Sequence, residues 1–155
     1  MAKQHLSAWD GFDYNAGLPP AGLICVGFLW RHGAMNALPT LGGNSAQAMG
    51  VNNRGQVVGL AENSTQDPIC VPPQVLDIEA VIWGPRPGEI QTLAPLAGDI
   101  SAWAIGINDR EQIIGLSVDC VSPNFNAPGA TTLQHGVIWQ NGTVTNIGTL
   151  GGSYV

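Results

Sequence analysis

The sequence predicts an all-β protein built from repeated units of four short strands. Three tryptophans, each ending a short apolar run, recur at intervals of 53 and 56 residues: Trp30, Trp83 and Trp139. Between them, short runs rich in Val and Ile alternate with Gly, Pro and Asn, and no run shows the sustained apolar periodicity of an amphipathic helix. The pattern favours a β-propeller-like stack of four-stranded blades.

The repeat divides the chain into four parts. Residues 25–79 form the first unit and 80–135 the second, whereas 136–155 hold only the first half of a third unit. The N-terminal segment, 1–24, contains a four-residue echo of the second unit (Leu6 to Trp9) and is interpreted as a degenerate partial repeat. The chain therefore holds just under three blades.

Each complete unit contains four expected strands in the same order. The first strand ends in the tryptophan, the second follows a turn, the third precedes an Asn-rich turn and the fourth closes the unit. The expected strands cover 26–30, 34–38, 45–52 and 56–60 in the first unit, 80–83, 89–93, 101–108 and 112–116 in the second, and 136–139 and 143–147 in the third.

Side-chain sizes in the third and fourth strands predict how the sheets pack. In the second unit Trp103, Ile105 and Ile107 alternate with Ala102, Ala104 and Gly106. The small face lets a neighbouring sheet approach closely. The fourth strands are apolar on both faces, at Val57-Val58 and Ile113-Ile114, and we expect cover on both sides. Sheets packed face to face around an axis meet both requirements.

The turn between these two strands contains Asn52-Asn53-Arg54-Gly55, which predicts a hairpin closing on a glycine with positive φ. The second unit places Glu111 where the first has Gly55. There we expect a strained turn or a turn of another type.

Just under three blades do not close a propeller, which usually has four to eight. An incomplete ring exposes two apolar blade faces, which favours aggregation. Two resolutions follow: a parent protein with further repeats, or a homo-oligomer whose copies close the ring together. We expect the homo-oligomer.

Composition narrows the classes of partner. The chain has 155 residues, only five Lys and Arg, and a formal net charge of −6, which argues against a nucleic-acid-binding surface. No apolar stretch approaches the length of a membrane span. The first five residues have no apolar core, so we expect any secretory signal of the parent protein to lie outside this sequence.

Three cysteines cannot all pair within one molecule. Cys70 and Cys120 lie in corresponding long loops after the fourth strands, so a Cys70–Cys120 disulfide and two free thiols are both compatible with the sequence. Cys25 begins an apolar strand and is expected to be a small buried hydrophobe. The sequence contains no CxxC pair, so a zinc site is not expected.

The candidate metal ligands are four turn residues, Asn52, Asn53, Asn108 and Asp109. Carboxylates and amides in turns suit calcium, but the same residues commonly bond their own backbone, and we favour this turn role. We accordingly expect no cofactor, with bound calcium as the alternative.

No catalytic constellation stands out among the other polar and aromatic residues. Trp30, Trp83 and Trp139 hold equivalent strand positions and are expected in the core, whereas Trp9 is a candidate for stacking on a sugar ring. The histidines are scattered: His5, His32 in an expected hairpin turn, and His135 before a strand. Ser45 and Ser101 recur at one position, as structural hydroxyls do, and no G-x-S-x-G elbow occurs.

The repeat motif resembles the HAF repeat family of bacterial extracellular repeats, over about residues 25–152. The second unit departs from the pattern at Ala97, Asp99 and Glu111, and the third keeps 141–152. The resemblance implies a secreted or cell-surface β-propeller-like protein and supplies no catalytic residues. The matching residues of the first unit are Gly27-Phe28-Leu29-Trp30, Gly33, Met35, Leu41-Gly42-Gly43, Ser45, Ala46, Gly50-Val51-Asn52-Asn53 and Gly55-Gln56-Val57-Val58-Gly59.

Three functions remain open at this point. The first is a non-enzymatic extracellular repeat scaffold that binds a protein or glycan partner. The second is a propeller-type, lactonase-like hydrolase with a metal in the central channel, which needs carboxylates, Asn or His converging from several blades. The third is an inactive fragment of a larger repeat protein. The recurring polar positions are turn Asn, Ser and Gln, which also stabilise structure, so we favour the scaffold.

Overall fold

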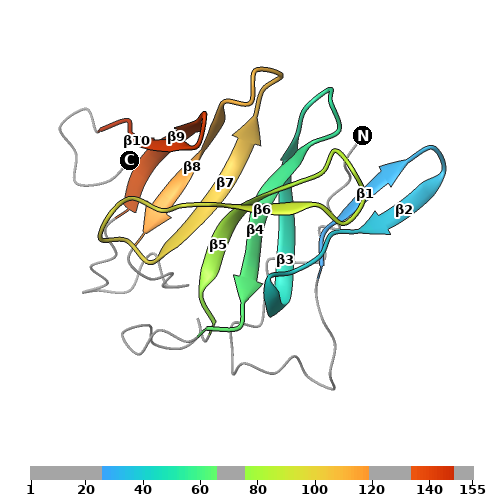
Figure 1. The fold of residues 1–155 in the computed structure, drawn as a ribbon, viewed down its shortest axis with the longest axis horizontal. Helices are drawn as coiled ribbons and strands as arrows, with labels where there is room; N and C mark the ends of the chain where they lie inside the picture. Colours follow the sequence, from blue (N-terminus) through green and yellow to red (C-terminus); the bar gives the residue numbers. More distant parts are fainter. Residues whose placement is uncertain (1–25, 66–75, 119–133, 149–155) are drawn as a thin grey trace.

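The computed structural model describes residues 26–65, 76–118 and 134–148, and this part of the chain is all-β, as predicted. Ten strands lie where the sequence analysis expects them (Figure 1). They are β1 (Phe28–Arg31), β2 (Ala34–Ala37), β3 (Gly42–Val51), β4 (Val57–Asn63), β5 (Ile78–Trp83), β6 (Ile90–Leu93), β7 (Ser101–Ile107), β8 (Ile113–Val118), β9 (Gln134–Gln140) and β10 (Thr143–Asn146).

The strands form one hairpin and two equivalent sheets. The first sheet has the order β3-β4-β5-β6 and the second β7-β8-β9-β10, both antiparallel throughout, while β1 and β2 pair only with each other. None of these sheets closes on itself among the described strands. Tight turns with positive φ at His32-Gly33 and Asn141-Gly142 connect β1 to β2 and β9 to β10, which places His32 in the expected hairpin turn.

Each sheet combines strands from two consecutive sequence units. In the first sheet β3 and β4 come from the first unit, whereas β5 and β6 come from the second, joined by six residue pairs between β4 and β5. The second sheet joins units two and three in the same way. The β1–β2 hairpin therefore corresponds to β5–β6 and β9–β10, the last two strands of a sheet.

The two faces of each sheet have different roles. We call the face that carries the tryptophan of each repeat the leading face. It includes Val57, Val81 and Trp83 in the first sheet, and Ala104, Val137 and Trp139 in the second. The opposite, trailing face carries Val58, Leu60 and Ala80 in the first sheet, and Ile114, Leu116 and Ile138 in the second.

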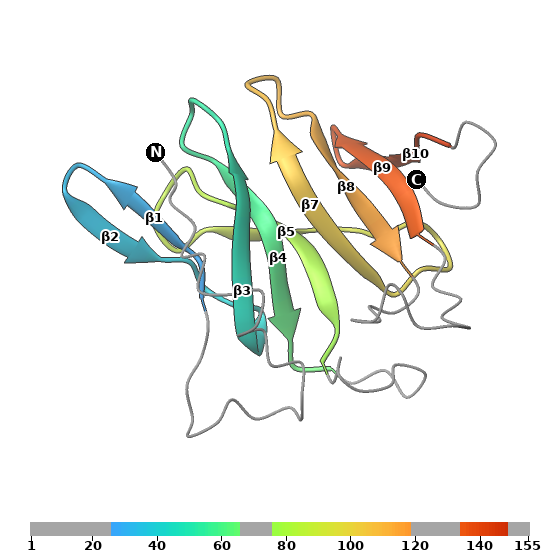
Figure 2. The same cartoon turned by 180° about the vertical axis from the view of Figure 1, so that it is seen from behind.

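The sheets stack with a leading face on a trailing face. The leading face of the first sheet packs against Leu29 and Leu38 of the β1–β2 segment. Its trailing face, through Val58 and Ala80, shares an apolar cluster with Ala104 of the second sheet. Strand β7 consequently lies next to β3, β4 and β5, as the view from behind shows (Figure 2).

Small residues permit this close approach, as the sequence predicts. Ala102 and Ala104 of β7 are buried against the first sheet. At Gly50 of β3 an added Cβ would lie 3.0 Å from the backbone oxygen of Ile105 on β7. The strict alternation expected along this strand is interrupted by a β-bulge between Ala104 and Gly106, which pairs Ile107 with Ile113 on the leading face.

Two expectations about burial hold in part of the molecule only. Trp83 and Trp139 are buried as predicted, but Trp30 is 45% exposed, and the prediction of a core position is wrong there. The leading face of the β1–β2 hairpin is open, since Met35, the cross-strand neighbour of Trp30, is also exposed. Likewise both faces of β4 are covered, whereas Ile114 on the trailing face of β8 is exposed.

Candidate functional site

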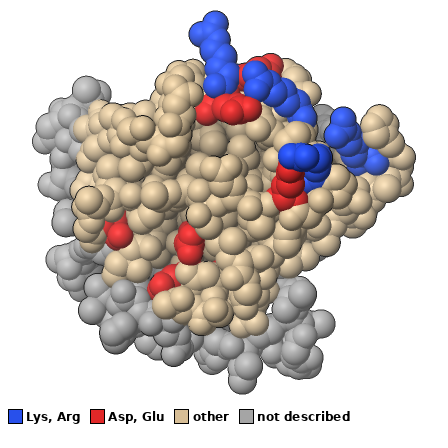
Figure 3. Space-filling view, viewed as in Figure 1, with Lys and Arg blue, Asp and Glu red and all other residues tan. Residues whose placement is uncertain are grey.

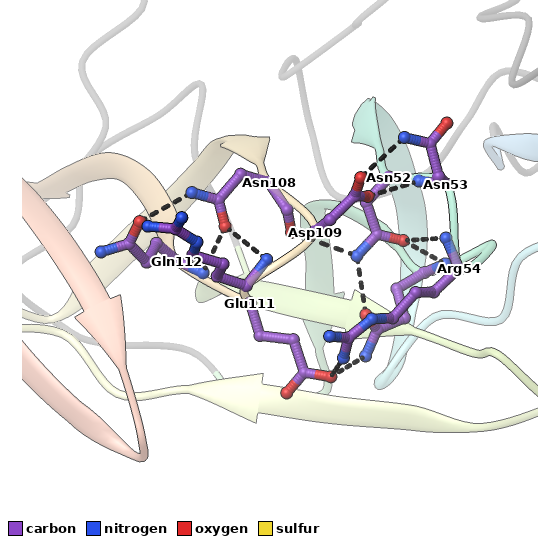
Figure 4. Close-up of polar contacts among 9 residues, drawn as sticks. Asn52, Asn53, Arg54, Asn108, Asp109, Glu111 and Gln112 are labelled. Atoms are coloured by element: carbon purple, nitrogen blue, oxygen red, sulfur yellow. Dashed lines mark hydrogen bonds and ion pairs between the residues drawn. The ribbon is translucent and has the colours of Figure 1, made fainter.

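The turn between β3 and β4 and the turn between β7 and β8 lie side by side and contain the four candidate ligands (Figure 4). The side-chain oxygen of Asn52 accepts hydrogen bonds from the backbone N–H groups of Arg54 (3.1 Å) and Gln56 (3.0 Å). Asn108 does the same for Arg110 (2.9 Å) and Gln112 (3.0 Å). Both asparagines thus fold their own turns.

A second set of hydrogen bonds joins the two turns to each other. Asn53 donates its backbone N–H to one oxygen of Asp109 (2.9 Å) and its side-chain amide to the other (2.7 Å). Asn52 donates its amide to the backbone oxygen of Asn108 (3.3 Å). Each of these bonds connects residues 56 positions apart, so equivalent positions of successive units bond to one another.

Glu111 extends this cluster, which we call the turn ladder. Its φ of 60° resembles the 80° of Gly55, so the second turn keeps the geometry of the first, and of the two expected alternatives the strained turn is the one observed. A non-glycine residue there carries backbone strain. Its carboxylate accepts from Arg54 (2.8 Å) and from the amide of Gln56 (3.1 Å), which explains what the side chain contributes.

The carboxylate of Asp109 in the turn ladder is held by hydrogen bonds from Asn53. The hydrogen bonds from Asn53 hold the pKa of Asp109 below its usual value, so the carboxylate is ionised at neutral pH. Both of its oxygens face Asn53. The described residues contain no group of three or more His, Cys, Asp or Glu arranged to hold a metal ion.

A second polar cluster, absent from the sequence analysis, lies at the other end of the second sheet. The buried carboxylate of Asp99 accepts from the Ser117 hydroxyl (2.5 Å) and faces Nδ1 of His135 (3.0 Å) through the same oxygen. Ser117 in turn accepts the backbone N–H of Leu96 (2.9 Å). The serine proton therefore points to the carboxylate, unlike a nucleophilic serine, whose proton passes to histidine. The cluster ties the segment before β7 to β8 and β9.

The third feature is a groove of about 380 Å³ between the β1–β2 hairpin and the turn from β5 to β6. Its walls are mainly apolar, and two arginines reach it. Arg86 is paired with Glu89 (2.6 Å), whereas Arg31 forms no ion pair within the described part of the chain. The groove-lining residues that matter here are Leu29, Arg31, Val57, Trp83, Pro85 and Arg86.

The arginines gather at this end of an acidic protein, and acidic side chains lie next to several of them. The chain has a net charge of −6, yet basic side chains gather along the turn end and beside the hairpin in Figure 3. The arginines of the described residues are Arg31, Arg54, Arg86 and Arg110.

Several candidate residues lie outside the described residues. They are Trp9, His5, Cys25, Cys70 and Cys120, so the stacking and disulfide hypotheses stay predictions. Sequence reasoning singled out the turn residues but did not find Asp99. The corresponding residues of the first unit are Asn44, Ala61 and Glu79, so the repeat carries no signal for this cluster.

Comparison of the chain with protein-family models, curated proteins and solved structures finds no match. Within the described ranges there is no helix long and apolar enough to cross a membrane. The features of the described residues that bear on function are the turn ladder, the buried carboxylate cluster and the groove.

Proposed function

We propose that this chain is a non-enzymatic scaffold module of a secreted or cell-surface protein, whose sheets pack in a β-propeller-like manner and which binds a protein or glycan partner. The resemblance of its motif to the HAF repeat supports the extracellular assignment. The partner recognised by the groove carries carboxylate groups. The Cys70–Cys120 disulfide and calcium binding are secondary hypotheses within the same proposal.

The scaffold part of the proposal is supported by what the candidate polar residues do. In the turn ladder Asn52, Asn53 and Asp109 are engaged in fixing the turns and joining successive units. The Asp99 carboxylate likewise connects segments of the second sheet. Side chains engaged in this way stabilise the architecture. A hydrolase would need such groups for its reaction, and here they are used in structural contacts.

The observation that carries the binding part is Arg31. Its guanidinium lines the groove beside apolar walls and has no ion pair within the described residues, in contrast to Arg86 on the opposite wall. An arginine presents a rigid fork of donors that suits a carboxylate. Apolar walls with a few placed polar groups are typical of ligand sites.

The test measures binding by calorimetry with three probes: an oligogalacturonide, a glutamate-rich peptide and an uncharged maltooligosaccharide. We expect one of the acidic probes to bind and the neutral one to fail, with affinity falling as salt rises. Arg31→Ala should weaken binding about tenfold, the equivalent of about 1.4 kcal/mol. Arg110→Ala, an exposed arginine outside the groove, is the matched control.

Two results would contradict the proposal. One is acidic-probe binding that Arg31→Ala leaves unchanged, which would remove the groove from the argument. The other is metal-dependent turnover of a lactone or ester by the purified chain, which would favour the hydrolase alternative.

A further inference from the structure

One apolar contact is made twice along this chain. In each case two residues on the trailing face of a two-stranded segment pack against a tryptophan and an aliphatic residue on the leading face of the next. The segments are equivalent in the repeat, so the contact is the same structural feature at successive positions. The paired residues are Leu29 and Leu38 with Trp83 and Ile90, then Ile82 and Leu93 with Trp139 and Val144.

A hydrogen bond accompanies the contact at both positions. The indole N–H of Trp83 donates to the backbone oxygen of Pro39 (2.9 Å), the residue after Leu38. The indole N–H of Trp139 donates to the backbone oxygen of Ala94 (2.7 Å), the residue after Leu93. The combination of an apolar pair and a satisfied indole donor makes the contact specific as well as apolar.

Both halves of a third such contact are present but uncovered. The leading half, on the β1–β2 hairpin, is Trp30 (45% exposed) and its cross-strand neighbour Met35 (66% exposed). The trailing half is Ile138 of β9 and Ile147 after β10, the latter 60% exposed. The two halves lie at opposite ends of the molecule, on β1–β2 and on β9–β10 (Figure 1).

The correspondence between the exposed and the buried residues is complete. Trp30 and Met35 hold the positions of Trp83 and Ile90. Ile147 holds the position of Leu38, because each donates its backbone N–H to the backbone oxygen of the glycine three residues before the tryptophan of its unit, Gly136 and Gly27 respectively. A surface with this pattern fits its complement in the same chain better than an unrelated apolar surface would.

We propose that a second copy of this chain occupies these surfaces by head-to-tail association. The trailing face of β9–β10 in one copy packs on the leading face of β1–β2 in the next. Trp30 Nε1 of the second copy donates to the backbone oxygen of Gly148, the residue after Ile147, in the first. The assignment rests on the repeat architecture of the proposed scaffold and names the partner of its two ends.

Head-to-tail contact is favoured over a symmetric contact by the hydrogen bond. Two leading halves facing each other would pair two indole donors with no backbone acceptor between them. Two trailing halves would leave both tryptophans exposed. A heterologous contact satisfies both halves at once and generates either a closed ring or an open filament.

The test uses light scattering coupled to size exclusion at micromolar concentration. We expect the wild-type chain to have the mass of two or more copies. Met35→Asp and Ile147→Asp each destroy one half, so each variant alone should be monomeric. Mixed one to one, they should form a heterodimer and nothing larger, because the mixture retains one intact leading half on the Ile147→Asp chain and one intact trailing half on the Met35→Asp chain. Val51→Asp, at an exposed position outside both halves, is the control and should keep the wild-type mass.

A monomeric wild-type chain would overturn the proposal, as would a wild-type mass in either aspartate variant or a mixture that stays monomeric. Both substituted side chains are exposed, and circular dichroism verifies that the variants are folded. Trp30→Phe provides a second variant that keeps an aromatic ring but lacks the donor, and we expect it to weaken association at least fivefold. A monomer that still binds the acidic probe would leave the scaffold function intact while removing self-association.

Discussion

The two sheets of this protein have the same strand order and nearly the same register, but very different trailing faces. Val58 of the first sheet is completely buried, whereas its equivalent in the second sheet, Ile114, is 52% exposed. Both residues are β-branched and sit in the same position of a strand that reads as apolar on both faces. The difference lies in what covers the face: the second sheet covers the first, and no described strand covers the second.

The leading faces of the two sheets, by contrast, are nearly identical. Trp83 and Trp139 are both buried and both donate to a backbone oxygen of the preceding segment. Each tryptophan ring lies over a glycine, Gly59 or Gly115. The comparison teaches that an equivalent sequence position has equivalent burial only where the neighbouring element is also equivalent.

The largest expected effect tests the shared leading face. Gly59→Ala and Gly115→Ala should each lower the free energy of unfolding by about 3 kcal/mol or more, because overpacking a closed site forces the backbone to move. An added Cβ would lie 1.9 Å from the backbone oxygen of Gln47 or Trp103. The measurement is chemical denaturation of each variant.

Gly106→Ala is the matched control for this prediction. Its added Cβ would lie 3.4 Å from the side chain of Ile114, an ordinary contact. We expect a change within about 0.5 kcal/mol, as is usual away from such crowded sites. A small effect at Gly59 or Gly115 would mean that the strands can separate there at little cost.

An intermediate effect tests the contrast between the trailing faces. Val58→Ala removes buried methyl groups between the sheets and should lower the free energy of unfolding by about 2 kcal/mol. Ile114→Ala removes a larger side chain from an exposed position and should change stability by less than about 0.5 kcal/mol. Denaturation in the monomeric Met35→Asp background checks both values without a contribution from association. Equal losses at the two positions would show that the trailing face of the second sheet is covered in solution.

The smallest effect concerns the turn ladder, where Glu111 replaces the glycine of the first unit. An exposed ion pair such as Arg54–Glu111 contributes about 0–1 kcal/mol, and a left-handed non-glycine residue costs about 1–2 kcal/mol. Glu111→Ala loses the pair and keeps the strain, whereas Glu111→Gly loses the pair and relieves it. In thermal unfolding, Glu111→Gly should therefore be more stable than Glu111→Ala by about 1 kcal/mol. The reverse order would show that the φ of this residue carries no strain.

Much of the candidate site was accessible from sequence because it repeats. Asn52 and Asn108 were identified as turn residues from their spacing to a following glycine or its replacement, and they do fold those turns. That Asn53 bonds Asp109 was not accessible, since the bond depends on how one sheet lies on the other. The Asp99–Ser117–His135 cluster occurs only in the second unit among the described residues, so the repeat pattern could not predict it.

The sequence by itself determined the strands, the hairpins closed by tight turns and the small residues that let the sheets approach, because alternation, turn residues and glycines act over a few positions. Only the tertiary structure decided where a sheet begins. The sheets join the second half of one unit to the first half of the next, a pairing invisible in the repeat. It also decided which of several equivalent apolar residues are buried. Burial of Trp83 and exposure of Trp30 depend on which elements pack against each strand, and a strand's own residues do not encode that neighbour.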